Sequence, residues 1–186
     1  NTPTRKGYEF VGWSVEGVEG LSMDITIPQG STENRQYTAN WKATEYSLSY
    51  ELNGGIVSPD NPAKYTIESE DITLTNPAKA GYTFDGWTGT SVDVTESKDV
   101  TILKGSTGNR EYAANWTLNL YTISYDLDGG AVSSDNPTSY TVESADIKLT
   151  QPTKLGYAFA GWYTDPAFSQ RYDFDTPVTQ ALTLYA

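Results

Sequence analysis

The chain has 186 residues, of which 37% are hydrophobic, and this size and composition favour several small folded units over one large core. Its 24 acidic and 12 basic side chains give a net charge of -12, which would repel nucleic acid phosphates and anionic lipids. It contains neither Cys nor His, which excludes disulfides, cysteine nucleophiles, histidine triads and the common zinc and copper sites.

The sequence begins at Asn1, and Met23 is its only methionine, so we expect a piece of a longer protein whose targeting signals lie elsewhere. It has no apolar run long enough to cross a bilayer, so no membrane insertion is expected within this stretch.

The first element along the chain is the stretch GYEFVGW at 7–13, which returns as GYTFDGW at 81–87 and GYAFAGW at 156–162. The Tyr, Phe, Gly and Trp are fixed, while the residues between them change from copy to copy. We therefore predict a strand whose Tyr, Phe and Trp form the core of each unit. The Gly before Trp either lets the chain bulge or lets an aromatic ring lie over bare backbone, and in both cases the Trp turns inward.

The motif belongs to a longer repeat. A shift of about 75 residues aligns 46–87 with 121–162, at about 26 identical positions of 42, and also aligns 30–41 with 105–116. This period predicts tandem small domains of one kind.

We place their boundaries as follows: the back portion of one repeat at 1–41, a full repeat at 46–116, and a near-complete repeat at 121–186, joined by linkers at 42–45 and 117–120. These are called the first, second and third repeats below.

The second repeat opens with alternating apolar and polar residues at 46–53, which predicts a half-buried strand. The Asn-Gly-Gly turn at 53–55 and a loop follow, and alternation resumes near Tyr65. Turn residues between two alternating segments predict a hairpin. The third repeat has the same pattern from Tyr121.

Ile72 and Leu74 form a short apolar element before Pro77, either a brief strand or a single helical turn. A last strand closes each unit, at YAANW in the second repeat and LTLYA in the third. The expected fold class is mainly β or α+β, with about four strands and at most one short helix in each unit.

A unit that opens YTISYDLDGG, continues YTVESADIKLTQPTKLGYAFAGWYTDPAF and closes LTLYA resembles the Listeria-Bacteroides repeat, the family that includes the B repeat of internalin B. The resemblance covers nearly the whole chain. It implies a β-grasp-like fold, similar to ubiquitin or SUMO, and tandem placement in large secreted or wall-anchored bacterial surface proteins. Residues 1–41 depart from the pattern because they lack the opening pair of strands.

Aromatic side chains and carboxylates are the candidates for a binding site. Tyr82, Phe84 and Trp87 could form a platform for a sugar, but their fixed spacing favours core packing. Paired acids, Asp126 with Asp128 and Asp173 with Asp175, are too few for calcium, so a solvated face is expected. We expect no catalytic residue, no metal and no cofactor.

Lysines at equivalent positions, Lys79 and Lys154, could form the Lys-to-Asn crosslink known from bacterial surface stalks. The first repeat has Arg5 at this position, which cannot form such a bond, so the crosslink is the less favoured reading.

The function indicated is therefore a non-enzymatic stalk or spacer that presents other domains on the bacterial cell surface, monomeric within a longer chain. The alternative is an adhesive module in which the variable back of the repeat, 163–181, binds a host protein or a glycan.

Overall fold

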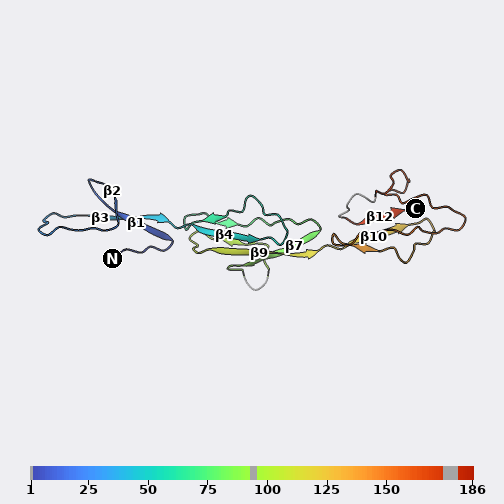
Figure 1. Cartoon of the computed structure of the whole chain (residues 1–186), viewed down its shortest axis with the longest axis horizontal. Helices are drawn as coiled ribbons and strands as arrows, with labels where there is room; N and C mark the ends of the chain where they lie inside the picture. Colours follow the sequence, from blue (N-terminus) through green and yellow to red (C-terminus); the bar gives the residue numbers. More distant parts are fainter. Residues whose placement is uncertain (1, 93–95, 174–179) are drawn as a thin grey trace. The chain divides into compact units, whose positions relative to one another are not determined.

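A computed structural model of the chain describes residues 2–92, 96–173 and 180–186. The described residues form strands and loops and contain no helix, which confirms the mainly β prediction (Figure 1). No helix that could span a membrane is found in this part of the chain. Two compact units are distinguished, unit 1 from Asn1–Pro77 with Asp85–Asn115 and unit 2 from Ala78–Phe84 with Trp116–Ala186.

The first repeat is a three-stranded antiparallel sheet in the order β2-β1-β3, formed by β1 (Tyr8–Val15), β2 (Val18–Ser22) and β3 (Tyr37–Ala43). Its centre is Phe10, which is 8% exposed and makes edge contacts with Trp13 at 5.3 Å and Trp41 at 5.5 Å between ring centroids. The partial repeat therefore has a small aromatic core of its own.

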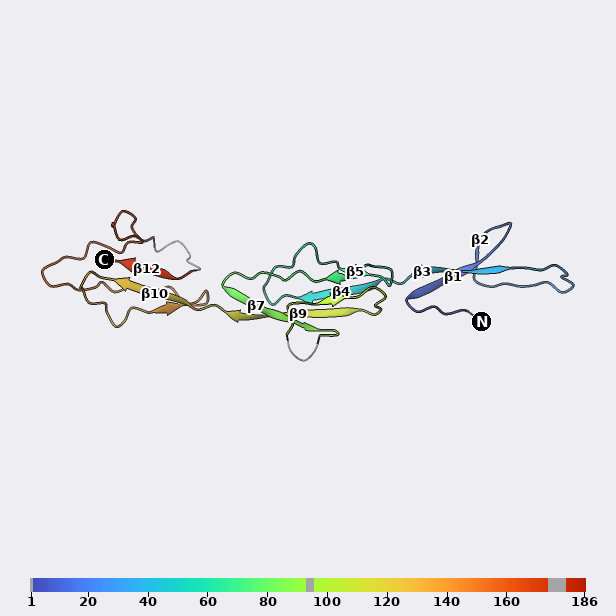
Figure 2. The same ribbon diagram turned by 180° about the vertical axis from the view of Figure 1, so that it is seen from behind.

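The second repeat has a four-stranded sheet in the order β5-β4-β9-β7, whose strands are labelled in Figure 2, and a two-stranded sheet of β6 with β8. The strands are β4 (Tyr46–Glu51), β5 (Lys64–Tyr65), β6 (Ile72–Thr73), β7 (Tyr82–Gly89), β8 (Thr101–Ile102) and β9 (Arg110–Leu118). Strands β4 and β5 pair antiparallel, as the predicted hairpin requires, and β4 pairs parallel with β9. The element at 72–74 is a strand, not a helical turn.

The core of the second repeat is built on Trp87, which is fully buried. Its ring lies 5.9 Å from that of Tyr50 and 6.4 Å from that of Tyr112, between centroids. The side chains of Leu48 and Ile102 are also buried. Alternation along β4 places Leu48 and Tyr50 on one face, and the pairing of Tyr50 with Tyr112 of β9 puts the Tyr112 ring on the same face.

The third repeat repeats the pairing, with β10 (Tyr121–Asp126) between antiparallel β11 (Ser139–Tyr140) and parallel β12 (Leu182–Tyr185). Its core contains Ile123, Leu127, Trp162 and Leu184. The predicted strand at 156–162 is wrong in this copy, where only the next residue, Tyr163, forms a bridge to Tyr185. In the first repeat the same stretch pairs with β3, from Tyr8 with Ala43 to Trp13 with Ala39.

Candidate functional site

The Gly before the Trp of the motif forms the predicted bulge. The register of β1 with β3 shifts between Phe10 and Gly12, and Gly12 has φ 134°. Gly86 has φ 156°, and a Cβ added there would lie 2.8 Å from the backbone nitrogen of Ser97. The bulge therefore accepts only glycine, both for its backbone conformation and for the space available.

An asparagine holds each bulge in place. The side-chain amide of Asn115 donates to the carbonyl of Gly86 at 3.1 Å, and that of Asn40 donates to the carbonyl of Gly12 at 3.3 Å and to the Ser14 hydroxyl at 2.9 Å. Sequence reasoning missed this role, although the Asn-Trp pair at the end of two repeats was the available signal.

The Trp of the motif is a core residue and offers no exposed platform. Trp87 is fully buried and its indole N–H donates to the side-chain oxygen of Asn76 at 3.2 Å, and Trp162 is 4% exposed. Phe10 is also buried, while Phe84 and Phe159 are half-buried. The core assignment of Phe and Trp thus agrees with the structure, and the sugar platform does not.

The Tyr of the motif is different, and its assignment to the core is wrong. The backbone N–H of Tyr8 donates to the carbonyl of Arg5 at 3.1 Å across a turn whose third residue, Gly7, has φ 76°. The same turn recurs at 79–82 and 154–157. A turn with a left-handed glycine at its third position is type II, and here it directs the Tyr outward at the start of the strand.

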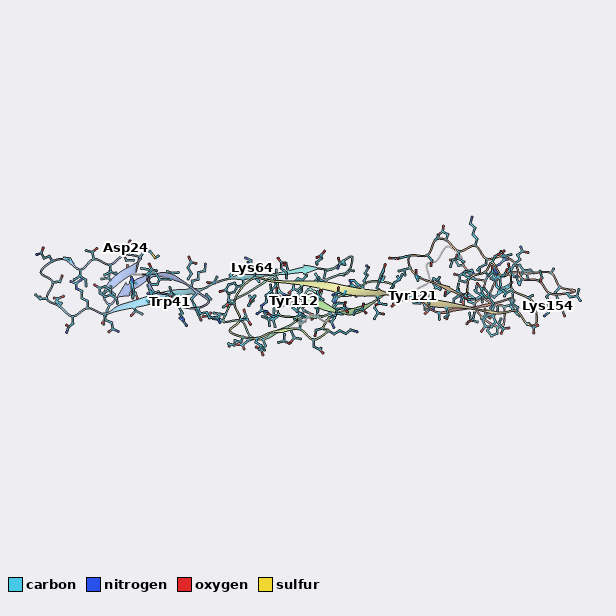
Figure 3. The ribbon with its side chains drawn as sticks, turned by 90° about the horizontal axis from the view of Figure 1, so that it is seen from below. Asp24, Trp41, Lys64, Tyr112, Tyr121 and Lys154 are labelled. Carbon is cyan, nitrogen blue, oxygen red and sulfur yellow. The ribbon has the colours of Figure 1, made fainter. Side chains whose placement is uncertain are left out.

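A cation covers each of these tyrosine rings. The guanidinium of Arg5 lies 3.8 Å from the ring centroid of Tyr8, and the ammonium of Lys79 lies 3.9 Å from that of Tyr82. Lys154 repeats the contact in the third copy at 4.5 Å, and its position in the third repeat is labelled in Figure 3. The recurrent Lys or Arg is therefore explained by a cation–π contact, which both residue types can make.

This turn contacts the repeat that follows it. Within unit 1, the Tyr8 hydroxyl donates to the Glu68 carboxylate at 2.9 Å. A Cβ on Gly7 would lie 2.6 Å from the terminal methyl carbon of Ile67, so Gly7 provides the space in which Ile67 packs. The hydrogen bond to Glu68 raises the pKa of Tyr8, since it favours the protonated hydroxyl.

The same contact recurs one repeat later, within unit 2. The Tyr82 hydroxyl donates to the Glu143 carboxylate, and the side chain of Val142 packs against Gly81, where a Cβ would overlap it. The hydrogen bond to Glu143 raises the pKa of Tyr82. We call each such pair of segments a junction. Its socket is the type II turn of one repeat, at 5–8 or 79–82. Its knob is the segment of the next repeat that reads Thr-Ile-Glu-Ser at 66–69 or Thr-Val-Glu-Ser at 141–144.

An apolar cleft in the third repeat has a volume of about 380 Å³ and is lined by Phe159, Tyr157, Phe168 and Ala186 among others. In the two other repeats a tryptophan covers the equivalent Phe, with Trp41 on Phe10 at 5.5 Å and Trp116 on Phe84 at 5.3 Å between ring centroids. The equivalent Phe of the two sister repeats is thus packed against an aromatic ring, whereas Phe159 lines this cleft.

A second cleft of about 400 Å³ in the second repeat is lined by the strand residues Tyr50, Tyr112, Glu51 and Glu111 among others. Burial raises the pKa of Tyr50 to about 12, and its hydroxyl donates to the carbonyl of Pro62 at 2.9 Å. This hydroxyl is therefore protonated and engaged at neutral pH, which disfavours it as a general base.

The candidate carboxylates do not converge. Asp128 pairs with Lys154 at 2.9 Å on the surface, where the Asp side chain is 85% exposed, and Asp126 accepts a hydrogen bond from the Asp128 backbone N–H. Asp175 lies outside the described residues. Among the residues that the structure does describe, no group of three potential metal ligands occurs.

One carboxylate in the variable segment 163–181 has a structural role. Asp165 accepts hydrogen bonds from the backbone N–H groups of Ala167 at 3.0 Å, Ser169 at 3.1 Å and Gln170 at 2.7 Å. These bonds, led by that from Ser169, lower the pKa of Asp165. The loop they hold carries Phe168, which has φ 52° and is 49% exposed, so a large apolar side chain lies partly exposed on this loop.

Comparison with known proteins matches three consecutive segments of the chain to described domains. Residues 2–45 and 46–120 each match the divergent InlB B-repeat domain, and residues 121–186 match the Listeria-Bacteroides repeat domain. No solved structure matches the chain.

Similar relatives include two proteins of Evansella cellulosilytica, with the provisional names membrane protein and Gly-rich membrane protein, and internalin H of Listeria monocytogenes. The first two are 32% and 31% identical over 99% of this chain, and internalin H is 29% identical over 82% of it. The chain spans 27%, 21% and 30% of the length of these three relatives.

Proposed function

The chain belongs to the internalin-related repeat family that comprises the Listeria-Bacteroides repeat and the divergent InlB B-repeat, and we propose that it is a non-enzymatic spacer that presents other domains of a secreted or wall-anchored bacterial surface protein. The relatives support a location at the cell surface through their names, internalin and membrane protein. Each of them is much longer than this chain, which leaves room for domains to be presented.

The observation that carries the proposal is the recurrent junction. Tyr8 with Glu68 and Tyr82 with Glu143 join consecutive repeats through the same pair of segments. The predicted linkers, 42–45 and 117–120, are shorter in the structure, because β3 runs to Ala43 and β9 to Leu118. The remaining connections, 44–45 and 119–120, would not by themselves fix the orientation of successive repeats. An apolar contact and a hydrogen bond to the next repeat would restrain that orientation, and the cation–π pair within the turn holds the tyrosine ring that donates the bond. Such restraint is what a spacer needs.

Repeat size and charge support the same role. A unit of about 70 residues has a radius of gyration near 11 Å, so each added repeat would extend a spacer by roughly 30 Å. The net charge of -12 would keep neighbouring chains on a crowded surface apart.

Surface display tests the proposal. A bacterial anchor would carry this chain with a tag for antibody binding at its outer end, and deletion of residues 46–120 should reduce binding of a bulky antibody. An unrelated rigid spacer of similar length should restore it. If only the native repeat restores the signal, length is not its function.

The second candidate is an adhesive module, favoured by the exposed Phe168 on the loop that Asp165 holds. An exposed aromatic side chain on a preorganised loop suits recognition of a host protein or a glycan. Binding of the chain to host cells that is lost on Phe168→Ser, with unchanged thermal stability, would favour this candidate.

The finer fold assignment, a β-grasp-like unit, stays a prediction. The parallel pair β4 and β9 at the centre of the order β5-β4-β9-β7 supports it. The helix expected to cover such a sheet is not found among the described residues.

A further inference from the structure

The third repeat carries a socket with the geometry of the two engaged ones. Its turn has the same hydrogen bond, from the Tyr157 N–H to the Lys154 carbonyl at 3.1 Å, and Gly156 has φ 80°. Lys154 covers the Tyr157 ring as Arg5 and Lys79 cover theirs. The chemistry of the socket is therefore complete in this copy.

The surroundings of this third socket differ from those of the other two. Tyr157 is 72% exposed and Leu155 is fully exposed, whereas Tyr8 and Tyr82 are half-buried against their knobs. A Cβ placed on Gly156 would meet nothing within 4 Å, whereas one on Gly7 would lie 2.6 Å from Ile67. The third socket is thus open in the described structure.

The knob is a preformed element. In the second repeat, the Ser69 N–H donates to the Thr66 carbonyl at 3.1 Å and the Ser69 hydroxyl accepts from the Thr66 N–H at 2.9 Å. The third repeat has the same two bonds at the same lengths, between Thr141 and Ser144. This fixed turn presents one β-branched side chain and one carboxylate, so little ordering is needed when it docks.

We propose that the exposed Lys154–Tyr157 turn is the docking site for the Thr-Val-Glu-Ser or Thr-Ile-Glu-Ser knob of a further repeat of this family. The missing Cβ of Gly156 leaves space for the Val or Ile, the Tyr157 hydroxyl donates to the Glu, and Lys154 adds charge complementarity.

A separate molecule of this same chain does not fit this site well. Its sequence contains the knob twice, at 66–69 and 141–144, and both copies are engaged within the chain. The occupant is therefore a repeat with its own opening half, placed after the third repeat. This proposal rests on the proposed spacer function in one respect: a spacer is lengthened by the addition of repeats, and each added repeat needs a docking site on the one before it.

The test appends one further repeat to the third repeat, at the position where the third repeat follows the second. Ala186 corresponds to Ala114 in the pairing of β12 and β9, so a copy of residues 115–186 is appended after Ala186. The appended copy carries Tyr157→Phe, so that Tyr157 occurs only in the third repeat. The readout is the rate of nitration of Tyr157 by tetranitromethane, measured by peptide mass spectrometry. In the extended chain this rate should fall to that of Tyr82 in the same molecule, and Val142→Asp in the appended copy alone should restore it. An unchanged rate at Tyr157 would overturn the proposal.

A second arm keeps the test decisive if the appended copy does not fold. In the chain of 186 residues, Val142→Asp should expose Tyr82 to nitration and leave Tyr157 unchanged. Val142 is 40% exposed, so this change does not disturb the core. Continued protection of Tyr82 would show that the knob does not bury the socket, and the proposal would fail even if the display experiment supported a spacer.

Discussion

The hydroxyl of Tyr82 donates a hydrogen bond to the carboxylate of Glu143, a residue 61 positions further along the chain. The first repeat makes the same bond from Tyr8 to Glu68, 60 positions further. The two hydrogen bonds join the same residue types, Tyr and Glu, at nearly the same separation in sequence. The repeat therefore encodes its contact with the next repeat as well as its own fold.

The first prediction concerns this bond. Glu143→Ala should lower the pKa of Tyr82 towards the ordinary tyrosine value of about 10, because the bond to Glu143 is the main cause of its elevation. A raised pKa in the folded state stabilises the junction fully below about pH 10, and that contribution is lost as the pH rises through the folded pKa. Absorbance titration of tyrosine checks this, with Glu70→Ala as a control on an acid that pairs elsewhere, with Lys104. Equal titration curves for the variant and the parent would contradict it.

The second prediction concerns the core. Trp87→Ala should lower the free energy of unfolding by about 3–5 kcal/mol, because it removes a fully buried indole. Trp13→Ala in the first repeat is the matched variant and should cost less, since Trp13 is half-buried. Urea unfolding followed by circular dichroism measures both. If Trp87→Ala left the stability unchanged but abolished binding of a ligand, the motif would be a binding site and this prediction would be wrong.

The third prediction concerns the bulge. Gly86→Ala should destabilise the second repeat more than Gly108→Ala, although both glycines have positive φ. The added Cβ meets the backbone at Ser97 in the first case and open space in the second. Backbone strain alone costs of order 1–3 kcal/mol and is common to both variants. Equal losses in thermal unfolding would show that the space at Gly86 is not limiting.

The fourth prediction concerns the loop at 164–171. A pKa of Asp165 lowered in the folded state stabilises the loop above the ordinary Asp pKa of about 3.9, and the contribution is lost as the pH falls through the folded pKa. Asp165→Asn should therefore speed amide exchange of Ser169 and Gln170 at neutral pH. Asp146→Asn, on the exposed surface of the same repeat, should not. Unchanged exchange at both amides would mean that the carboxylate does not hold the loop.

Much of the fold follows from local patterns in the sequence. Alternation at 46–53 and the Asn-Gly-Gly turn predicted the β4–β5 hairpin, and the fixed Phe and Trp predicted the core. These features depend on period and on turn chemistry, which a single sequence displays. Strand β2 was missed because its residues are all exposed, although the Glu-Gly turn between Val15 and Val18 was a hairpin signal.

The junction could not be predicted from the motif alone. The Tyr of the motif is the same in all three copies, and for that reason Tyr82 was assigned to the core together with the Phe and the Trp. Its role depends on Glu143, which lies in another repeat, and no local pattern brings the two together. The recurrence of Lys or Arg three residues before the Tyr was visible, but only the geometry of the turn shows that the cation lies over the ring.

Small-angle X-ray scattering of the chain at physiological salt tests the spacer account most directly. A compact globule of 186 residues would have a radius of gyration of about 16 Å. The account predicts a clearly larger value with the profile of an elongated particle, and a further change towards a flexible chain in Val142→Asp. A value near 16 Å for the unmodified chain would contradict it.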